Sequence, residues 1–165
     1  MTSWQPDVLP GYWQRTIALG PDPHGEGELF ATVVRRGDAA GSDRAVLAVH
    51  GYTDYFFQTE IADYFAARGF AFYALDLHKC GRSRRPGQTA HFITNLAAYD
   101  TELLAALDLI AVDTGGAQVC LYGHSAGGLI TTLFADRLRR TCSAHRLSAL
   151  ILNSPFFDLQ GPAVL

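Results

Sequence analysis

The chain has 165 residues, of which 48% are hydrophobic and 18% charged, and its net charge is −3. This length and composition predict one globular domain, residues 1–165, with its own core. The weak negative charge and the lack of a long basic run argue against nucleic-acid or anionic-membrane partners. No apolar run is long enough to span a membrane and no secretory signal is visible, so we expect a cytoplasmic protein. The irregular spacing of Cys80, Cys120 and Cys142 indicates neither a disulfide framework nor a metal site, and we expect no cofactor.

Two segments near the N-terminus predict an antiparallel hairpin. Residues 12–19 and 29–34 have the length and residue content of strands. The residues between them, 20–27, are dense in glycine, proline and aspartate, which favour turns.

Four continuous apolar runs follow, and such runs are typical of strands that are buried on both faces of a parallel sheet. They cover residues 45–49, 70–75, 119–122 and 147–152. Helical patterns separate them: residues 60–68 before Gly69, a helix capped by Asn95 and running through Ile110, and residues 129–138. This order predicts an α/β fold in which a mostly parallel sheet follows an antiparallel hairpin.

The segment Gly123-His124-Ser125-Ala126-Gly127 lies between a predicted buried strand and the third predicted helix. In that setting a Gly-x-Ser-x-Gly sequence favours a sharp turn that lifts the serine side chain above the sheet. A serine in this position can attack a carbonyl carbon when a base and oxyanion donors are near. We therefore predict that Ser125 is a nucleophile; an ordinary glycine-rich turn is the alternative.

Two further motifs precede this one, His50-Gly51-Tyr52 and the segment from Asp76 to Ser83. In this order the three motifs resemble the α/β-hydrolase superfamily, and more closely its monoacylglycerol lipase and lysophospholipase group, the serine aminopeptidase S33-like hydrolases. The resemblance implies an α/β-hydrolase fold and hydrolysis of small, lipid-like carboxylic esters through an acyl-enzyme on Ser125. It also implies that the backbone N–H groups of Tyr52 and Ala126 form the oxyanion hole.

The segment from Asp76 to Ser83 departs from the family pattern D-x-R-G-x-G-x-S. His78 and Lys79 replace the usual arginine and glycine, and Cys80 replaces a residue that is usually histidine. We therefore expect a loop of different shape. We interpret Asp76 as a structural acceptor for the backbone of residues 81–83 or as a partner of Arg82. The basic residues of this region are interpreted as a solvated loop: Arg82, Arg84 and Arg85.

Other residues near these motifs allow structural interpretations. His50 is expected to organise its loop instead of acting as the base, and the side chain of His124 is expected to point away from the serine hydroxyl. An apolar acyl region or a cover for the core could explain the aromatic residues that follow Gly51. These are Tyr52, Tyr55, Phe56 and Phe57.

The other members of a catalytic triad are not evident in the sequence. The family order is serine, acid, histidine. Asp158 is a candidate for the acid, and no residue matches the catalytic histidine; His145 alone follows Ser125. The resemblance therefore implies the N-terminal part of a hydrolase, ending before the cap and the last strands.

A chain without a base is expected to be nearly inactive by itself. The alternatives are a cleaved or degenerate hydrolase, or a non-enzymatic binding protein that retains the turn. In a chain that ends before the last strands of the fold, the strand at 147–152 would form an exposed sheet edge, which predicts self-association.

Overall fold

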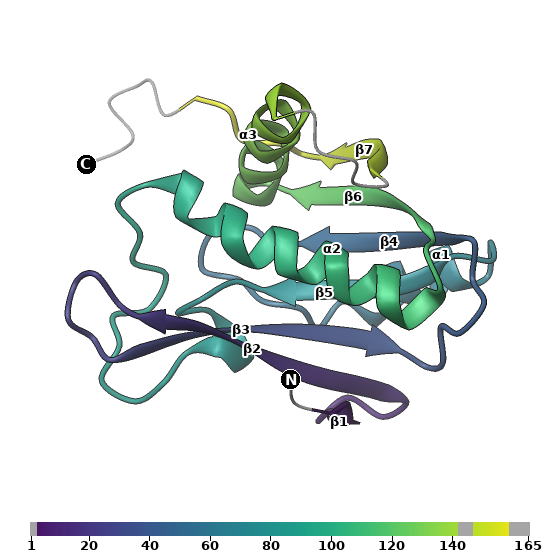
Figure 1. Ribbon diagram of the computed structural model, residues 1–165, viewed down its shortest axis with the longest axis horizontal. Helices are drawn as coiled ribbons and strands as arrows, with labels where there is room; N and C mark the ends of the chain where they lie inside the picture. The colour runs from purple at the N-terminus through teal and green to yellow at the C-terminus, as the bar shows by residue number, and fades with distance from the viewer. Residues whose placement is uncertain (1–2, 142–146, 159–165) are drawn as a thin grey trace.

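The computed structural model describes residues 3–141 and 147–158. Its seven-stranded sheet has the order β1-β2-β3-β5-β4-β6-β7 (Figure 1). The N-terminal strands β1 (Gln5–Pro6), β2 (Tyr12–Pro21) and β3 (Glu28–Arg36) pair antiparallel, and β3 also pairs antiparallel with β5. The remaining pairs are parallel and involve β4 (Arg44–Val49), β5 (Ala71–Asp76), β6 (Gln118–His124) and β7 (Leu147–Asn153). The predicted hairpin is confirmed, and so is the parallel arrangement of the strands that follow it, within a sheet that is mixed as a whole.

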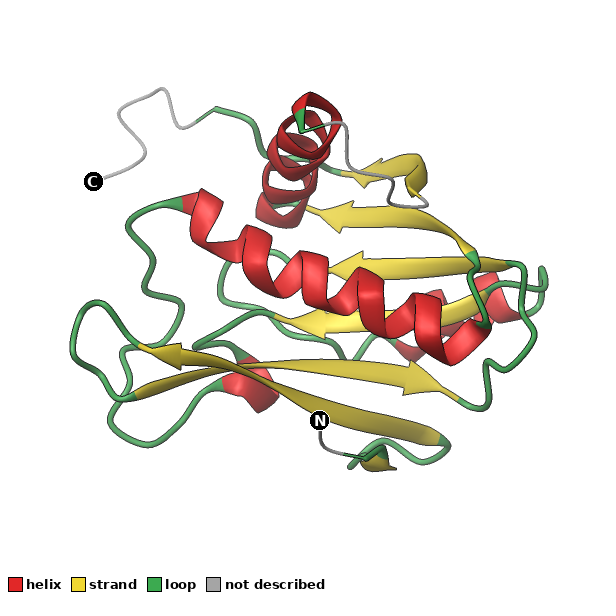
Figure 2. Ribbon diagram, viewed as in Figure 1, coloured by secondary structure: helices red, strands yellow, loops and turns green. Residues whose placement is uncertain are grey.

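Three α-helices accompany the sheet in the described residues, α1 (Thr59–Ala66), α2 (Asp100–Thr114) and α3 (Ala126–Arg140) (Figure 2). The predicted cap at Asn95 is confirmed, because its side chain accepts a hydrogen bond from the Ala97 N–H (3.0 Å). The predicted end at Ile110 was wrong: the helix continues to Thr114, where Gly115 turns the chain with a φ of 80°. Its first turn, Leu96–Tyr99, is a 3₁₀ helix.

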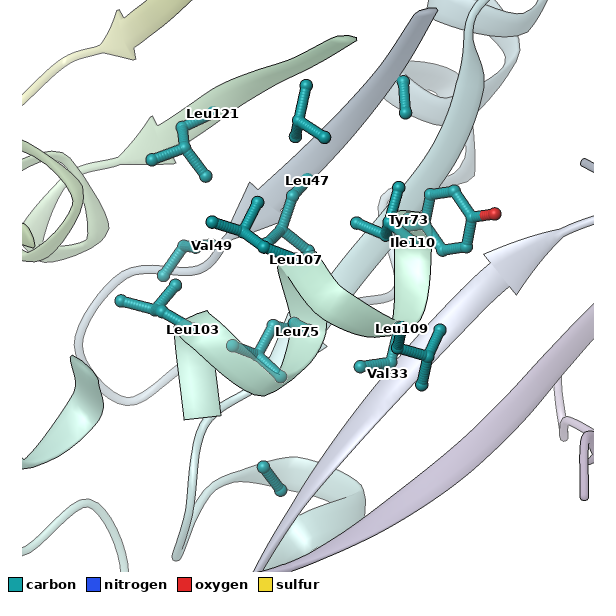
Figure 3. Packing of buried hydrophobic residues seen from close by; sticks show 14 of the residues in the cluster. Val33, Leu47, Val49, Tyr73, Leu75, Leu103, Leu107, Leu109, Ile110 and Leu121 are labelled. Carbon is teal, nitrogen blue, oxygen red and sulfur yellow. The ribbon is translucent and has the colours of Figure 1, made fainter. Parts of the chain in front are cut away.

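Apolar residues of the central strands face both sides of the sheet, which explains their continuous apolar runs. On one face, Leu47 and Leu75 pack with α2 residues such as Leu103 (Figure 3). On the other face, Val46 and Phe72 pack with α1 residues that include Phe65 and Ala62. Two apolar layers therefore hold the strands from which the functional loops emerge.

β7 pairs with β6 and lies at the end of the sheet within the described part of the chain. Its Ile151 and Leu152 are exposed by 40% and 36%. Self-association through this edge stays a prediction that sedimentation at several protein concentrations would test. No helix in the described part is both long and apolar enough to cross a membrane.

Candidate active site

Three loops leave the carboxyl edge of the sheet side by side, because β5, β4 and β6 are neighbours. They begin at Leu77, at His50 and at Ser125. In α/β sheets of this kind, ligands bind outside the carboxyl ends of the strands. The structure thus brings the three sequence motifs together at the edge where a ligand would bind.

Ser125 occupies the turn between β6 and α3 with φ 51° and ψ −120°, a conformation that is rare for a residue with a side chain. Its N–H donates to the carbonyl oxygen of Asn153 (3.0 Å). Its own carbonyl oxygen accepts from the N–H groups of Gly128 (2.9 Å) and Phe156 (3.0 Å). Such a backbone costs about 1–3 kcal/mol and is held by the surrounding structure. The predicted sharp turn is present.

Close backbone packing explains the glycines on either side of Ser125. A Cβ atom at Gly127 would collide with the carbonyl oxygens of Val49 and His50. A Cβ atom at Gly123 would lie 2.7 Å from the carbonyl oxygen of Gly127. Backbone groups of the sheet edge and of α3 cannot move aside as the end of a flexible side chain can, so both positions require glycine.

The two predicted oxyanion residues, Tyr52 and Ala126, line a common cavity of about 70 Å³ beside this turn. Ala126 is the first residue of α3, so its N–H has no acceptor within the helix. The loop of Tyr52 approaches the serine closely, because a Cβ atom at Gly51 would lie 3.1 Å from the Cβ of Ser125. The structure therefore brings the three residues together, and their chemical roles stay predictions.

The aromatic residues after Gly51 divide between the two interpretations offered for them. Phe56 is 4% exposed and packs in the core against Phe72, with the ring centroids 5.4 Å apart. Tyr52, Tyr55 and Phe57 are exposed by 71%, 44% and 53%. Phe56 therefore covers the core, whereas the other three lie on the surface near the turn.

His50 connects two of the loops, as the interpretation of it as an organising residue predicted. Its Nδ1 lies 2.8 Å from the Gly51 carbonyl oxygen, and its Nε2 lies 3.1 Å from the Leu77 backbone nitrogen. The first contact needs an N–H on Nδ1 and the second needs a lone pair on Nε2, so both ring atoms are engaged in the neutral form. A ring engaged in this way has no nitrogen available to accept a proton from Ser125.

His124 lines a larger cavity, of about 220 Å³, that lies on the α1 side of the sheet. Its Nδ1 lies 3.9 Å from Asp54 Oδ2. Apolar side chains that include Phe72 and Ile61 also line this cavity, together with Asn153. An apolar cavity of this kind, lined by the residue before Ser125, can hold an aliphatic group.

Asp76 has the structural role that was predicted for it. Its Oδ2 accepts hydrogen bonds from the Arg82 N–H (3.0 Å) and guanidinium (2.9 Å), and its Oδ1 accepts from the Phe56 N–H (2.8 Å). The interpretation of Arg82 as solvated was wrong, because its side chain is only 11% exposed and also pairs with Asp7 at 2.7 Å. Two carboxylates draw this arginine out of solvent, whereas Arg84 is exposed.

Lys79 stands where the family pattern has glycine and keeps a positive φ of 60°. Its Nζ lies 2.7 Å from both Asp22 Oδ2 and Glu26 Oε2, and its side chain is 1% exposed. Glu26 also accepts a hydrogen bond from the Thr89 N–H (3.0 Å). The loop was expected to differ from the family pattern, and it does so through a buried cation, Lys79, which joins it to the β2–β3 turn. These partners were not predicted from the sequence, although two acids in that turn were a signal.

His78 stands where the family pattern has arginine, and it contacts a fully buried carboxylate. Its Nδ1 lies 3.0 Å from Glu102 Oε2, and its backbone N–H donates to Oε1 (3.2 Å). Burial raises the pKa of Glu102 despite these bonds. The pair joins the β5 loop to α2 and was also missed from the sequence.

A general base for Ser125 is not evident among residues 3–141 and 147–158, where no imidazole hydrogen-bonds to its hydroxyl. His145 lies outside the described residues. Asp158 is exposed, and its candidacy as the triad acid stays a prediction. No group of three potential metal ligands occurs in the described part. Within these ranges the edge of the sheet therefore presents Ser125 together with the predicted oxyanion residues Tyr52 and Ala126.

Solved structures share this architecture at low sequence identity. A protein from Agrobacterium vitis S4 has a TM-score of 0.68 and 19% identity, and the match covers 91% of this chain and 58% of that one. A highly thermostable carboxyl esterase from Bacillus coagulans has a TM-score of 0.64 and 15% identity, and the match covers 84% of this chain and 43% of that one. A cold-adapted esterase from an Arctic intertidal metagenomic library has a TM-score of 0.59 and 22% identity, and the match covers 92% of this chain and 65% of that one. The chain thus spans between 43% and 65% of the length of these proteins.

Curated protein sequences contain no match to this chain. A protein family does match, and its description is serine aminopeptidase, S33. The match extends over residues 40–164, which include all three motifs at the carboxyl edge of the sheet. The fold and the family prediction are confirmed together: this chain belongs to the serine aminopeptidase S33 family of α/β hydrolases.

Proposed function

We propose that this chain carries the nucleophile and the oxyanion hole of a carboxylic-ester hydrolase. The observation that carries the proposal is the backbone of Ser125, which is held with φ 51° at a strand-to-helix turn. A serine there is presented to a ligand above the sheet, and the two residues proposed to supply the oxyanion N–H groups, Tyr52 and Ala126, line one cavity beside the turn. Family membership and the esterases among the similar structures also support the proposal.

The proposed reaction is acyl transfer. Ser125 Oγ attacks the ester carbonyl carbon and loses its proton to a base, and the carbonyl oxygen takes the negative charge. The Tyr52 and Ala126 N–H groups bind that oxygen, and each such donor is typically worth about 2.7–4 kcal/mol. The alcohol then leaves, and water hydrolyses the acyl-enzyme. A lipid-like acyl chain has room in the apolar 220 Å³ cavity beside His124.

A second candidate function is that of a binding protein that uses the turn without turnover. The observation that favours it is the lack of an imidazole bonded to Ser125 within the described residues. Removing the base of a serine hydrolase lowers turnover by about 10⁶. The chain alone should therefore acylate slowly, and the test must detect a single covalent event.

A fluorophosphonate probe provides that test. We expect labelling of the wild type to map to Ser125 by peptide mass spectrometry and to disappear in Ser125→Ala. Ser154→Ala is a matched control, because Ser154 is an exposed serine that also has a positive φ of 48°. Labelling that persists in Ser125→Ala, or that depends on Ser154, would rule out the proposed nucleophile. Binding of esters without any labelling would favour the second candidate.

A further inference from the structure

His91 lies beside the proposed oxyanion hole in a constrained backbone. Its φ is 58°, and its N–H donates to the carbonyl oxygen of Lys79 (3.1 Å). Lys79 is itself fixed by its buried ion pairs with Asp22 and Glu26. Lys79 and His91 are linked by this hydrogen bond, and both have a backbone conformation that is rare for residues with side chains. Local backbone strain of this kind often accompanies functional sites.

His91 shares a cavity with the predicted oxyanion residues and has a ring contact with one of them. His91 lines the same 70 Å³ cavity as Tyr52 and Ala126, and its ring centroid lies 6.0 Å from that of Tyr52 in an edge-on contact. Neither of its ring nitrogens has a hydrogen-bond partner within the described part of the chain, and Nδ1 is buried. The ring of His50, which lines the same cavity, is bonded at both nitrogens.

An unbonded imidazole in a cavity calls for a partner, since buried polar atoms in native proteins are nearly always hydrogen-bonded. Burial, the largest cause, and the charge of Arg84 lower the pKa of His91, so the ring is neutral near pH 7 and offers one donor and one acceptor. The other walls are mostly apolar and include Leu77, Ile93 and Ile130. One water molecule occupies about 10–15 Å³ of such a cavity. The 70 Å³ cavity therefore has room for a group of about five non-hydrogen atoms.

We propose that His91 is a substrate-binding residue that hydrogen-bonds to a hydroxyl on a short group attached to the scissile ester. The inference rests on the proposed function, because it places that ester carbonyl between Tyr52 and Ala126. The hydroxyl could belong to the alcohol, as in a glycerol monoester, or to the acyl group, as in a 3-hydroxybutyrate ester. The shared chemistry is one hydroxyl a few bonds from the reacting carbonyl.

Binding to the full chain carrying Ser125→Ala tests the inference without requiring turnover. Two pairs of esters are titrated by NMR: glycerol monobutyrate and methyl 3-hydroxybutyrate, each against the analogue whose hydroxyls are replaced by methyl groups. We expect the hydroxyl ester of one pair to bind about three- to tenfold more tightly, which is the net effect of one neutral hydrogen bond. The pair that shows the preference identifies the source of the hydroxyl.

The preference should disappear in His91→Phe and persist in part in His91→Asn, because asparagine tolerates a positive φ and keeps a polar amide. Phe92→Leu is the control, since Phe92 lines a different cavity, beside Lys79. In the Ser125→Ala chain, where His91 is intact, adding the hydroxyl ester should shift the ¹⁵N resonances of the His91 imidazole, and adding its methyl analogue should not. This readout therefore does not depend on substituting His91. Equal binding of both members of each pair, or a preference that survives His91→Phe, would overturn the inference. Fluorophosphonate labelling of Ser125 fails or succeeds independently of these results.

Discussion

The turn at Ser125 and the loop after β5 lie at the same edge of the sheet, yet they are held in opposite ways. Backbone contacts without charges fix the turn, where Gly127 touches the carbonyl groups of Val49 and His50. Buried ion pairs fix the loop, where Lys79 and Arg82 reach carboxylates from distant segments. Both regions hold a residue at positive φ, so the same kind of strain is balanced by close packing in one and by charge in the other.

This difference explains what could be predicted from the sequence. The requirements of the turn are local, so Gly123 and Gly127 at two residues from Ser125 predicted its geometry. The partners of Lys79 lie more than fifty residues earlier, at Asp22 and Glu26, and no local pattern connects them. The parallel sheet was equally predictable, because burial on both faces leaves continuous apolar runs. The His78–Glu102 pair and the unbonded His91 depend on tertiary placement and were missed.

The largest expected effect is that of Gly127→Ala. Helix propensity alone favours alanine by about 1 kcal/mol. The new Cβ would instead collide with two backbone carbonyl groups, which cannot repack without moving β4. We expect a loss of about 3 kcal/mol, the upper end of the usual cost of overpacking, in the free energy of unfolding measured in urea, and loss of fluorophosphonate labelling.

Gly87→Ala is the control for Gly127→Ala, because it introduces backbone strain without a steric collision. Its φ is 86°, and nothing lies within 4 Å of the added Cβ. It should cost about 1–2 kcal/mol and leave labelling unchanged. If Gly127→Ala proves no worse than Gly87→Ala, close packing does not hold the turn.

The second effect is that of Lys79→Met, which removes the cation of the charged loop. Asp22 would be left buried without its partner, and breaking a buried ion pair in this way costs about 3–5 kcal/mol. The double variant Lys79→Met/Asp22→Asn should be more stable than the single one, because it leaves less uncompensated charge. Urea unfolding measures both, and a double variant that is less stable than Lys79→Met would contradict a role for charge here.

As the pH falls, the charged loop after β5 should lose stability at a higher pH than the uncharged turn at Ser125. Hydrogen bonds from Lys79 and Thr89 lower the pKa of Glu26 to about 2 from 4.5. Since the folded-state pKa is lower than the unfolded one, this contribution is complete above about pH 4.5 and is lost as the pH falls towards 2. Burial opposes the shift at Asp22, but its hydrogen bonds with Lys79 and the backbone outweigh it and lower that pKa too. Stability measured between pH 6 and pH 2.5 should fall less steeply in Glu26→Gln than in the wild type.

The smallest effect is expected where a charge pair is exposed. Arg140 Nε lies 2.8 Å from Asp136 Oδ2 one helical turn away, and the two side chains are 71% and 42% exposed. An exposed pair of this spacing contributes about 0.3–0.5 kcal/mol, because water screens it and two long side chains must be ordered. Arg140→Gln should therefore change the free energy of unfolding by less than about 0.5 kcal/mol, and added salt should remove most of that difference. A change as large as that of Lys79→Met would mean that burial is not what gives the charged loop its strength.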